Sequence, residues 1–418
     1  MTKDMTTGSP LRIILLFSIP VLLGNLFQQF YNMVDTIIVG RYLGEEALAA
    51  VGSTGCLMFL VLGFANGIAQ GFGVMVSHAF GAKDFKLLLA WMHTPENIIA
   101  MADAYIKVIF AGILLTMAYN VLSGILRGIG DSRTPLYFLI LSSVLNIILD
   151  VVLIVYTGLG TAGAAYATII AQGVSAVLCF FYMYRKYDIL RTRHEDYYLD
   201  SAGVKNMLAI GVPMALNYSI TAIGTMIMQS AVNVFGSSVV AAFTAASKVS
   251  NIATQSMPTL GTAMATYCGQ NLGAGKYDRI YAGMRQGLFL CFGAAATAAA
   301  ICIFGGRFIV SWFVSNPSEE IFSSAMQYLT IASWFFLPLA MIFLYRNALQ
   351  GLDQGLIPML SGVVELACRF GVIALIPAST GFFGVCFADP AAWAGAGIPL
   401  FITYLLWEHR MKQCSKAA

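Results

Sequence analysis

Charged residues are scarce in this chain of 418 residues. They make up 10% of it, whereas apolar residues make up 59%, and the mean hydropathy is +0.78. Soluble domains carry about 25% charged residues, so this composition indicates a protein that crosses the membrane many times. The formal net charge is only +3, and nothing in its distribution indicates nucleic-acid binding.

Paired cysteines and clustered histidines are also absent. The eight cysteines stand singly, without a CxxC pair, and the four histidines show no HExxH spacing. We therefore expect the cysteines to be small core residues rather than disulfide partners or metal ligands. With no nucleophile–base pair, we expect neither an enzyme nor a cofactor. A cleavable signal peptide is not expected, because polar Met1–Pro10 leads into an apolar stretch too long for one.

Long apolar segments are abundant. A helix of about 20 residues crosses the hydrocarbon core, so these segments predict an all-α polytopic membrane protein. The eleven spans lie at 11–39, 48–78, 100–126, 136–157, 160–184, 207–234, 238–267, 282–313, 323–350, 355–377 and 384–407. A basic and polar connector, Tyr184–Lys205, interrupts them. We predict an N-terminal lobe at 1–184, a cytoplasmic linker at 185–206 and a C-terminal lobe at 207–418.

An internal repeat supports two lobes. The matching segments are Leu16–Pro20 with Ala209–Pro213 at an offset of 193 residues, Gly81-Ala82 with Gly273-Ala274 at 192, and Leu126–Gly128 with Leu349–Gly351 and Tyr105 with Tyr328 at 223. The increase in offset indicates that the first lobe lacks about 30 residues, one membrane span, between Lys83 and Pro95. The expected design is six plus six helices with the third helix missing.

The distribution of charge predicts the orientation. Loops rich in Lys and Arg alternate with acidic loops such as Glu45-Glu46 and Glu319-Glu320. Cytoplasmic loops carry the excess of Lys and Arg, so both termini are expected in the cytoplasm. Without a third helix, the loops at Lys83 and Glu96 would fall on the same face, which leaves the orientation of residues 79–98 open.

Polar side chains inside the apolar segments mark a candidate site. The segment Leu136–Tyr156 carries Asn146 and Asp150 one helical turn apart and therefore on one face. A carboxylate at this depth costs about 2.5–3.5 kcal/mol unless it faces a partner, an ion or a wet cavity. Asp150 is therefore a candidate functional residue.

Depth selects the residues that can meet this carboxylate. Alternating helix directions place Asp35, Thr168 and Tyr105 level with Asn146 and Asp150, in the outer half of the membrane. Two carboxylates, an amide and hydroxyl groups suit Na⁺ or a shared proton. A hydrogen-bond network that only holds the helices together is the alternative. Asn120 is also polar but lies nearer the cytoplasmic side.

The first helix carries Pro20, which removes a backbone hydrogen bond and permits a bend. Pro213 is its counterpart in the second half. The two prolines indicate either a shared mechanical role or an inherited kink without motion.

The second half does not repeat the carboxylates. Met228 corresponds to Asp35, and Arg369 corresponds to Asn146. Lys248 and Arg369 are expected to be its buried basic residues, and Glu365 and Arg369 have the i,i+4 spacing of a structural ion pair. Coupling to a cation is therefore expected in the N-terminal lobe.

Several motifs together resemble one known family. They are Pro20, Asp35 within NMVDTIIVGRYLG, GAKD at 81–84, LRGIGDSRTP at 126–135, NIILD at 146–150 and GQNLGAGK at 269–276. The chain resembles the multidrug and toxic compound extrusion (MATE) transporters over nearly its whole length, and more closely their DinF-like branch. The resemblance implies a MOP-type fold of two pseudo-twofold-related lobes and transport by alternating access.

The resemblance also implies roles for individual residues. It places a cation site, with Na⁺ as a possible metal ion, at Asp35, Asn146, Asp150 and Thr168. Gln28, Tyr105 and Asn120 match supporting positions of the cavity, and Pro20 matches a proline linked to bending of the first helix.

We therefore expect a monomeric antiporter in the bacterial cytoplasmic membrane that exports small organic cationic compounds, driven by Na⁺ or H⁺. Membrane lipids surround it. A flippase for lipid-linked precursors is one alternative, which a strongly basic cavity would favour. A degenerate homologue that does not transport is another, which the missing helix favours.

Overall fold

The structure, a computed structural model, describes residues 4–29, 104–105, 107–157, 159–188, 201–313, 319–375 and 378–417. These residues form helices and turns, with no β-strand among them. Six of the described helices are long and apolar enough to cross a membrane, or seven if one bent pair counts as a single span. The predicted span at 48–78, the interval 83–95 and Asp35 lie outside the described residues.

Packing divides the chain into two compact units. The first unit contains Leu23–Ser219, and the second combines Asp4–Leu22 with Ile220–Ala418. The first helix, Pro10–Gln29, thus contributes residues to both units. The lobe limits expected from the sequence at 184 and 207 stay a prediction.

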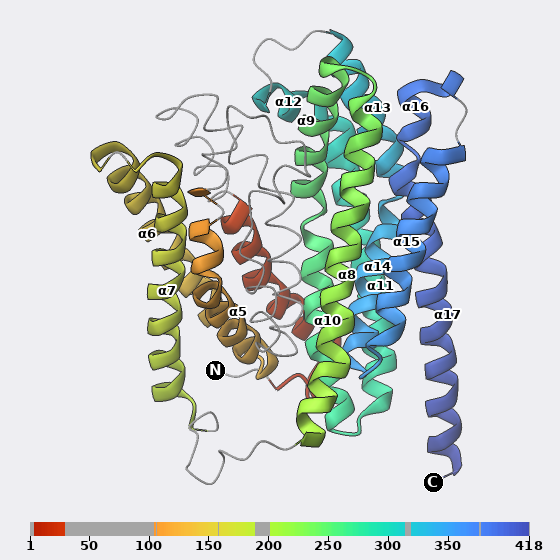
Figure 1. Cartoon of the computed structure of the whole chain (residues 1–418). Helices are drawn as coiled ribbons and strands as arrows, with labels where there is room; N and C mark the ends of the chain where they lie inside the picture. The colour runs from red at the N-terminus through yellow and green to blue at the C-terminus, as the bar shows by residue number, and fades with distance from the viewer. Residues whose placement is uncertain are drawn as a thin grey trace. The chain divides into compact units, whose positions relative to one another are not determined.

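The first unit is built on three labelled helices, drawn in orange to olive in Figure 1. They are α5 (Ile113–Gly128), α6 (Arg133–Asp150) and α7 (Gly160–Lys186). A π-helical turn, Val151–Tyr156, extends α6. The apolar helices Arg133–Tyr156 and Gly160–Lys186 correspond to the spans predicted at 136–157 and 160–184.

The remaining helices run from green to blue in Figure 1. They are α8 (Ser201–Asn233), α9 (Ser237–Thr254), α10 (Ser256–Gly273), α11 (Tyr277–Ala300) with a π turn at Ile301–Gly305, α12 (Gly306–Phe313), α13 (Glu319–Trp334), α14 (Phe336–Gly351), α15 (Leu356–Leu375), a 3₁₀ turn at Ala378–Thr380, α16 (Gly381–Val385) and α17 (Ala388–Ala417). The main part of the second unit begins within α8, at Ile220, and includes all the helices that follow.

Two predicted spans are each made of two helices. The segment at 238–267 is interrupted between α9 and α10, and that at 323–350 bends by 53° between α13 and α14. Pro258 and Pro338 each stand third in the helix after the break. A proline ring clashes with the carbonyl four residues earlier but is accepted in a first helical turn. Hydropathy alone predicts each of these segments as one span, because hydropathy does not depend on where a proline stands.

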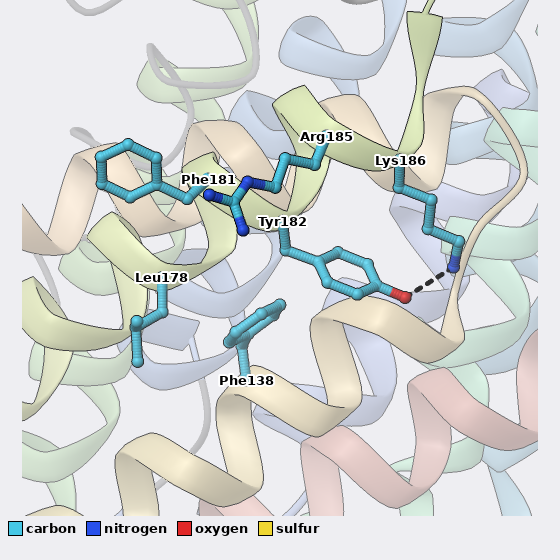
Figure 2. A pocket seen from close by; sticks show the side chains of 6 residues that line it. All are labelled: Phe138, Leu178, Phe181, Tyr182, Arg185 and Lys186. Atoms are coloured by element: carbon cyan, nitrogen blue, oxygen red, sulfur yellow. Dashed lines mark hydrogen bonds between the residues drawn. The ribbon is translucent and has the colours of Figure 1, made fainter.

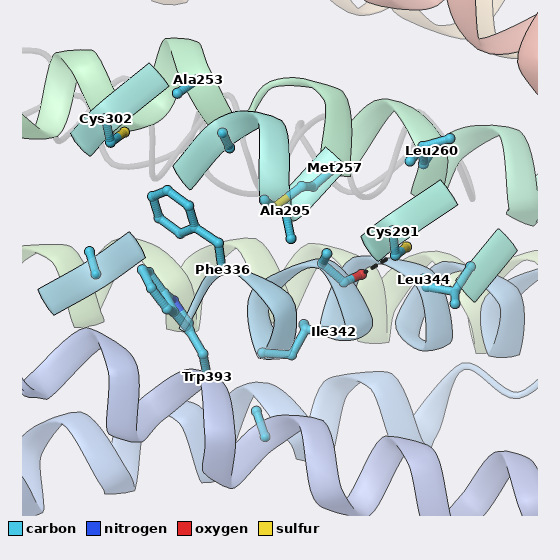
Figure 3. Packing of buried hydrophobic residues seen from close by; sticks show 14 of the residues in the cluster. Ala253, Met257, Leu260, Cys291, Ala295, Cys302, Phe336, Ile342, Leu344 and Trp393 are labelled. Carbon is cyan, nitrogen blue, oxygen red and sulfur yellow. Dashed lines mark hydrogen bonds between the residues drawn. The ribbon is translucent and has the colours of Figure 1, made fainter. Parts of the chain in front are cut away.

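Close helix packing forms the core of the second unit (Figure 3). Between α10 and α14 the backbones approach closely, since a Cβ added to Gly351 would lie 2.3 Å from the carbonyl oxygen of Ala265. Cys291 and Cys302 lie buried in this core, and the Cys291 thiol donates to the carbonyl of Ala340 at 3.6 Å. The described cysteines are free and all except Cys368 are buried, which confirms their role as core residues.

The segment before the first helix is anchored to the α10–α11 turn of the second unit. Buried Asn271 donates to the carbonyl of Met5 at 3.1 Å, and Arg279 donates to the carbonyls of Met5 and Gly8 at 3.1 and 2.8 Å. Gln270 accepts from the backbone N–H of Met5 at 2.9 Å. Gln270 and Asn271 of the GQNLGAGK motif thus have a structural role, because both bond the backbone of Met5.

Candidate functional site

The predicted cluster on α6 and α7 is buried in the first unit. Asn146 and Asp150 lie on α6 with 1% and 0% of their surface exposed. Thr168 lies on α7, which packs along α6. Because i and i+4 share a helix face, one stripe of α6 presents both the amide and the carboxylate to α7.

The amide of Asn146 bridges the other two residues. One end lies 2.9 Å from Oδ2 of Asp150, and the other lies 3.1 Å from the backbone nitrogen of Thr168. With the amide nitrogen toward Asp150, it donates to an ionised carboxylate, and the amide oxygen accepts from the Thr168 N–H. With the amide oxygen toward Asp150, two oxygens face each other, and only a proton or a cation between them removes the repulsion.

The hydroxyl of Thr168 donates to the carbonyl of Ala164 at 3.1 Å. Its proton is therefore directed along α7, which leaves the oxygen to act as an acceptor toward α6. Amide, carboxylate and hydroxyl oxygens are ligands that suit Na⁺ or a proton. The residues present fit either ion.

Asp150 is the last α-helical residue before the π turn at Val151–Tyr156. Single π turns inside α-helices occur frequently at functional sites, because they change which side chains face the neighbouring helix. No local pattern predicts this turn, since its residues, VVLIVY, carry no proline, glycine or charged residue.

The other predicted residues are more scattered. Tyr105 is buried, with 4% exposed, and Asn120 on α5 is half-buried. Gln28 is exposed near the end of the first helix, and Pro20 is buried in that helix within the second unit. The structure therefore brings together Asn146, Asp150 and Thr168, while Asp35 lies outside the described residues.

A second buried polar cluster lies in the second unit, on α14, α15 and α17. Glu365 accepts from Arg346 at 2.9 Å and from Arg369 at 3.3 Å. Arg369 also donates through Nε to Asp389 at 2.9 Å, and the Tyr328 hydroxyl donates to Asp389 at 3.0 Å. At most 14% of any of the four charged side chains is exposed.

This cluster confirms the Glu365–Arg369 pair predicted from i,i+4 spacing. The spacing rule did not predict Arg346 and Asp389, because they lie on other helices, 19 and 20 residues from their partners, where the i,i+4 spacing does not apply. Lys248 was expected to be buried, but it is exposed. Its place on α9 directs it away from the core that Ala246 and Val249 join.

A separate groove with a volume of about 450 Å³ lies along α6 and α7 (Figure 2). It is lined by Phe138, Leu178, Phe181, Tyr182, Arg185 and Lys186. Lys186 donates to the Tyr182 hydroxyl at 2.7 Å, beside the apolar part of the groove. Aromatic and basic side chains together are typical of a membrane–water boundary. None of the predicted cation-site residues lines this groove.

Asp131 closes the turn between α5 and α6, near the end of α7. It accepts from the backbone N–H of Thr134 at 3.1 Å and from its hydroxyl at 2.6 Å, and also from the hydroxyl of Tyr187. Burial raises the pKa of this carboxyl, but the hydrogen bonds from Thr134 and Tyr187 outweigh burial and lower it. This residue of the LRGIGDSRTP motif thus joins the cytoplasmic ends expected for three helices.

Within the described ranges, no group of three His, Cys, Asp or Glu side chains is placed to hold a metal ion. The α6–α7 cluster offers a single carboxylate there, which suits a monovalent ion better than a divalent one.

Buried polar clusters between long apolar helices define a multi-pass helical membrane protein. The MatE family model matches residues 20–89, 85–152 and 213–375, more than half of the chain. The chain belongs to the MatE family. It is therefore a membrane transport protein and not an enzyme.

Named relatives extend over nearly the whole chain. A probable multidrug resistance protein, YpnP of Bacillus subtilis (strain 168), is 28% identical over 416 residues, covering 91% of this chain and 92% of the relative. An outward-facing multidrug resistance MATE family transporter is similar in fold, with a TM-score of 0.86, 22% identity and coverage of 100% and 99%. A MOP superfamily transporter from Pyrococcus furiosus, with a binding pocket of reverse polarity, gives a TM-score of 0.87 at 22% identity, with 98% of both chains covered.

Proposed function

We propose that this protein exports small organic cationic compounds across the bacterial cytoplasmic membrane, driven by entry of Na⁺ or H⁺. The juxtaposition of Asn146, Asp150 and Thr168 carries the proposal, because a buried carboxylate beside amide and hydroxyl oxygens supplies ligands for a monovalent cation. The names of the relatives support multidrug export as the transport reaction.

The Asn146 amide gives the site two states. When the carboxylate is ionised and without an ion, the amide nitrogen stabilises it. When a proton or Na⁺ arrives, the amide turns its oxygen to the ion, as its distance of 2.9 Å from Asp150 permits. Binding thus changes the hydrogen bonds between α6 and α7, and any difference in affinity between outward-open and inward-open forms shifts their populations. Asp35 and a bend at Pro20 belong to the same proposed cycle.

The DinF-like branch and cytoplasmic termini are also part of the proposal, as is a monomer. The missing span between Lys83 and Pro95 is supported by the comparisons. The family model matches 20–89 and 85–152 as separate segments, and the 416 positions aligned with YpnP outnumber the residues that 91% of this chain supplies. The relative therefore has residues for which this chain has none.

Flipping of a lipid-linked precursor is less favoured. Such a substrate carries phosphate and needs an excess of buried positive charge. The buried basic residues of the second unit, Arg346 and Arg369, are already paired with Glu365 and Asp389.

Efflux of a fluorescent cationic dye from proteoliposomes, under separately imposed Na⁺ and H⁺ gradients, tests the proposal. One gradient should drive efflux, and Asp150→Asn should abolish it. Asp353→Asn is the matched control, because Asp353 is exposed and its φ of 61° is one that Asn accepts. Full activity of Asp150→Asn would overturn the proposal.

A chain with a helix restored between Lys83 and Pro95 separates the remaining outcomes. If only the restored chain transports, the natural chain is a non-transporting homologue. A third outcome is that neither the natural nor the restored chain transports the dye, but the natural chain moves a fluorescent lipid-linked phosphate between leaflets. The protein is then a flippase and not an exporter.

A further inference from the structure

The two buried polar clusters occupy equivalent positions of the internal repeat. Asn146 and Arg369 are 223 residues apart, as are Tyr105 and Tyr328. The following helices have their own landmark: Gly160 and Gly381 each open a helix with a positive φ, 58° and 56°. This landmark sets an offset of 221 residues for α7 against α16 and α17.

With this register, Asp389 corresponds to Thr168. The contacts then correspond as well. In the first unit the residue at the α6 position, Asn146, lies 3.3 Å from the Thr168 hydroxyl. In the second unit the residue at the same position, Arg369, lies 2.9 Å from Asp389. The same two helix positions therefore meet in both halves of the repeat.

The difference between the clusters is charge. In the first unit these positions hold Tyr105, Asn146, Asp150 and Thr168, with one formal negative charge. In the second they hold Tyr328, Arg369, Ile373 and Asp389, so the carboxylate has moved to the other helix and a guanidinium has been added. The neighbouring pair Arg346 and Glu365 is neutral by itself, and it replaces Ser123 and Ser142. The second cluster is balanced without an ion from outside.

The guanidinium of Arg369 is coordinated as a bound cation would be. Carboxylates from α15 and α17 contact it at 3.3 and 2.9 Å, and only 5% of its side chain is exposed. The backbone of α8 makes room for it, because a Cβ on Gly224 would lie 2.1 Å from its Nη1. Oxygen ligands from separate helices around one buried positive group form a cation site.

We propose that the second unit contains a second monovalent-cation site, and that the guanidinium of Arg369 fills it permanently. This inference rests on the cation site proposed for the first unit. It means that the second unit stays in the cation-bound form, and that one exchangeable ion, at Asp150, enters per transport cycle. Removing Arg369 should expose a site for a free ion of guanidinium size or smaller.

A purely structural ion pair makes a different prediction. Loss of Arg369 from such a pair leaves a cavity that a free guanidinium ion, the missing group itself, can refill, but that has no affinity for the smaller Na⁺. A filled cation site, in contrast, regains its stability with Na⁺ as well.

The first experiment measures thermal unfolding of the purified, full-length Arg369→Ala protein. Low-millimolar methylguanidinium should raise its Tm saturably, whereas the bulkier choline at equal ionic strength should not. The wild type should show no such rise with methylguanidinium, because its site is full. Absence of saturable recovery by Na⁺, measured with Asp150→Asn also present so that the first unit does not contribute, would overturn the proposal.

A second variant covers the case in which Arg369→Ala does not fold. The triple change Arg369→Asn, Ile373→Asp and Asp389→Thr gives these three positions of the second unit the residues of the first, while Arg346 keeps Glu365 paired. Equilibrium binding of radioactive Na⁺ or of protons by this purified protein should be double that of the wild type. Adding Asp150→Asn should return binding to the wild-type amount rather than to zero.

The two proposals fail differently. If the wild type binds no ion in an Asp150-dependent manner, the exporter proposal fails. If it does, and the triple variant binds no more than the wild type, the exporter proposal stands and the self-filled site is wrong.

Discussion

The helix pairs α6–α7 and α15–α17 show two ways to keep carboxylates inside an apolar bundle. In the first unit the Asn146 amide lies against Asp150 and reaches Thr168 on the neighbouring helix. The second unit gives Glu365 and Asp389 two arginines of its own. On the two proposals made above, the same backbone register holds an exchangeable ion in one half and a covalently attached positive group in the other.

The comparison explains how a repeat protein can divide its work. Once an arginine supplies the charge, that half no longer responds to the ion gradient, since its positive group cannot leave. A lobe that does not respond to the ion gradient can keep its conformation while the other lobe changes its own. The following predictions test this contrast from the largest expected effect to the smallest.

Glu365→Gln should have the largest effect on stability. It leaves Arg346 and Arg369 buried with one carboxylate fewer, and breaking a buried ion pair on one side costs about 3–5 kcal/mol. Thermal unfolding of the purified protein should show a marked fall in Tm. Glu320→Gln, at an exposed position on α13, is the matched control and should change little. An unchanged Tm for Glu365→Gln would mean that the two arginines do not depend on this carboxylate.

Gly224→Ala should come next. The added methyl group overlaps the Arg369 guanidinium at 2.1 Å and should push it away from Asp389, at a cost of about 1–3 kcal/mol. Gly293→Ala is the control, since nothing lies within 4 Å of a Cβ there and alanine favours a helix. Equal Tm values for both variants would show that the guanidinium has room to shift.

Asp131→Asn should cost about 1–2 kcal/mol at neutral pH, because a charged acceptor of the N–H groups at the start of α6 is lost. The equivalent turn of the second unit has Gln354 and no such carboxylate. The pKa of Asp131 is lowered by folding, so its stabilisation is complete above the unfolded value of about 3.9 and is lost as the pH falls through the folded value. Unfolding measured from pH 7 to acid should show the wild type and the variant converging.

Asp150→Asn should change stability least, by less than about 1 kcal/mol, although it stops transport. The exchangeable ion leaves together with the charge, so no buried arginine is stranded. The same unfolding assay in a buffer without Na⁺ tests this. A fall in Tm as large as that of Glu365→Gln would show that Asp150 has a permanent basic partner, and the contrast between the units would disappear.

Local sequence was sufficient for part of the site. The positions of Asn146 and Asp150, one turn apart in an otherwise apolar span, predict that both belong to the site. Thr168 is predicted because the alternating directions of successive helices place it at the same membrane depth as Asp150. Glu365 and Arg369 were paired by the same spacing rule. Each of these predictions uses only helix geometry and the cost of polar groups in lipid.

Other features needed the tertiary structure. Arg346 and Asp389 join Glu365 and Arg369 from other helices, 19 and 20 residues away along the chain. The anchoring of Met5 and Gly8 by Arg279 spans more than half of the chain. The correspondence of Thr168 and Asp389 required the backbone conformation of Gly160 and Gly381, because the repeat offset changes between the helices.

The sequence by itself determined the all-α membrane architecture, the repeat and the stripe of α6 that carries Asp150. Apolar length and helical period are local properties, so they can be read from neighbouring residues. The tertiary structure alone decided which charges on different helices balance one another. That balance depends on distances of about 3 Å between helices, which packing sets and which the i,i+4 spacing within one helix does not encode.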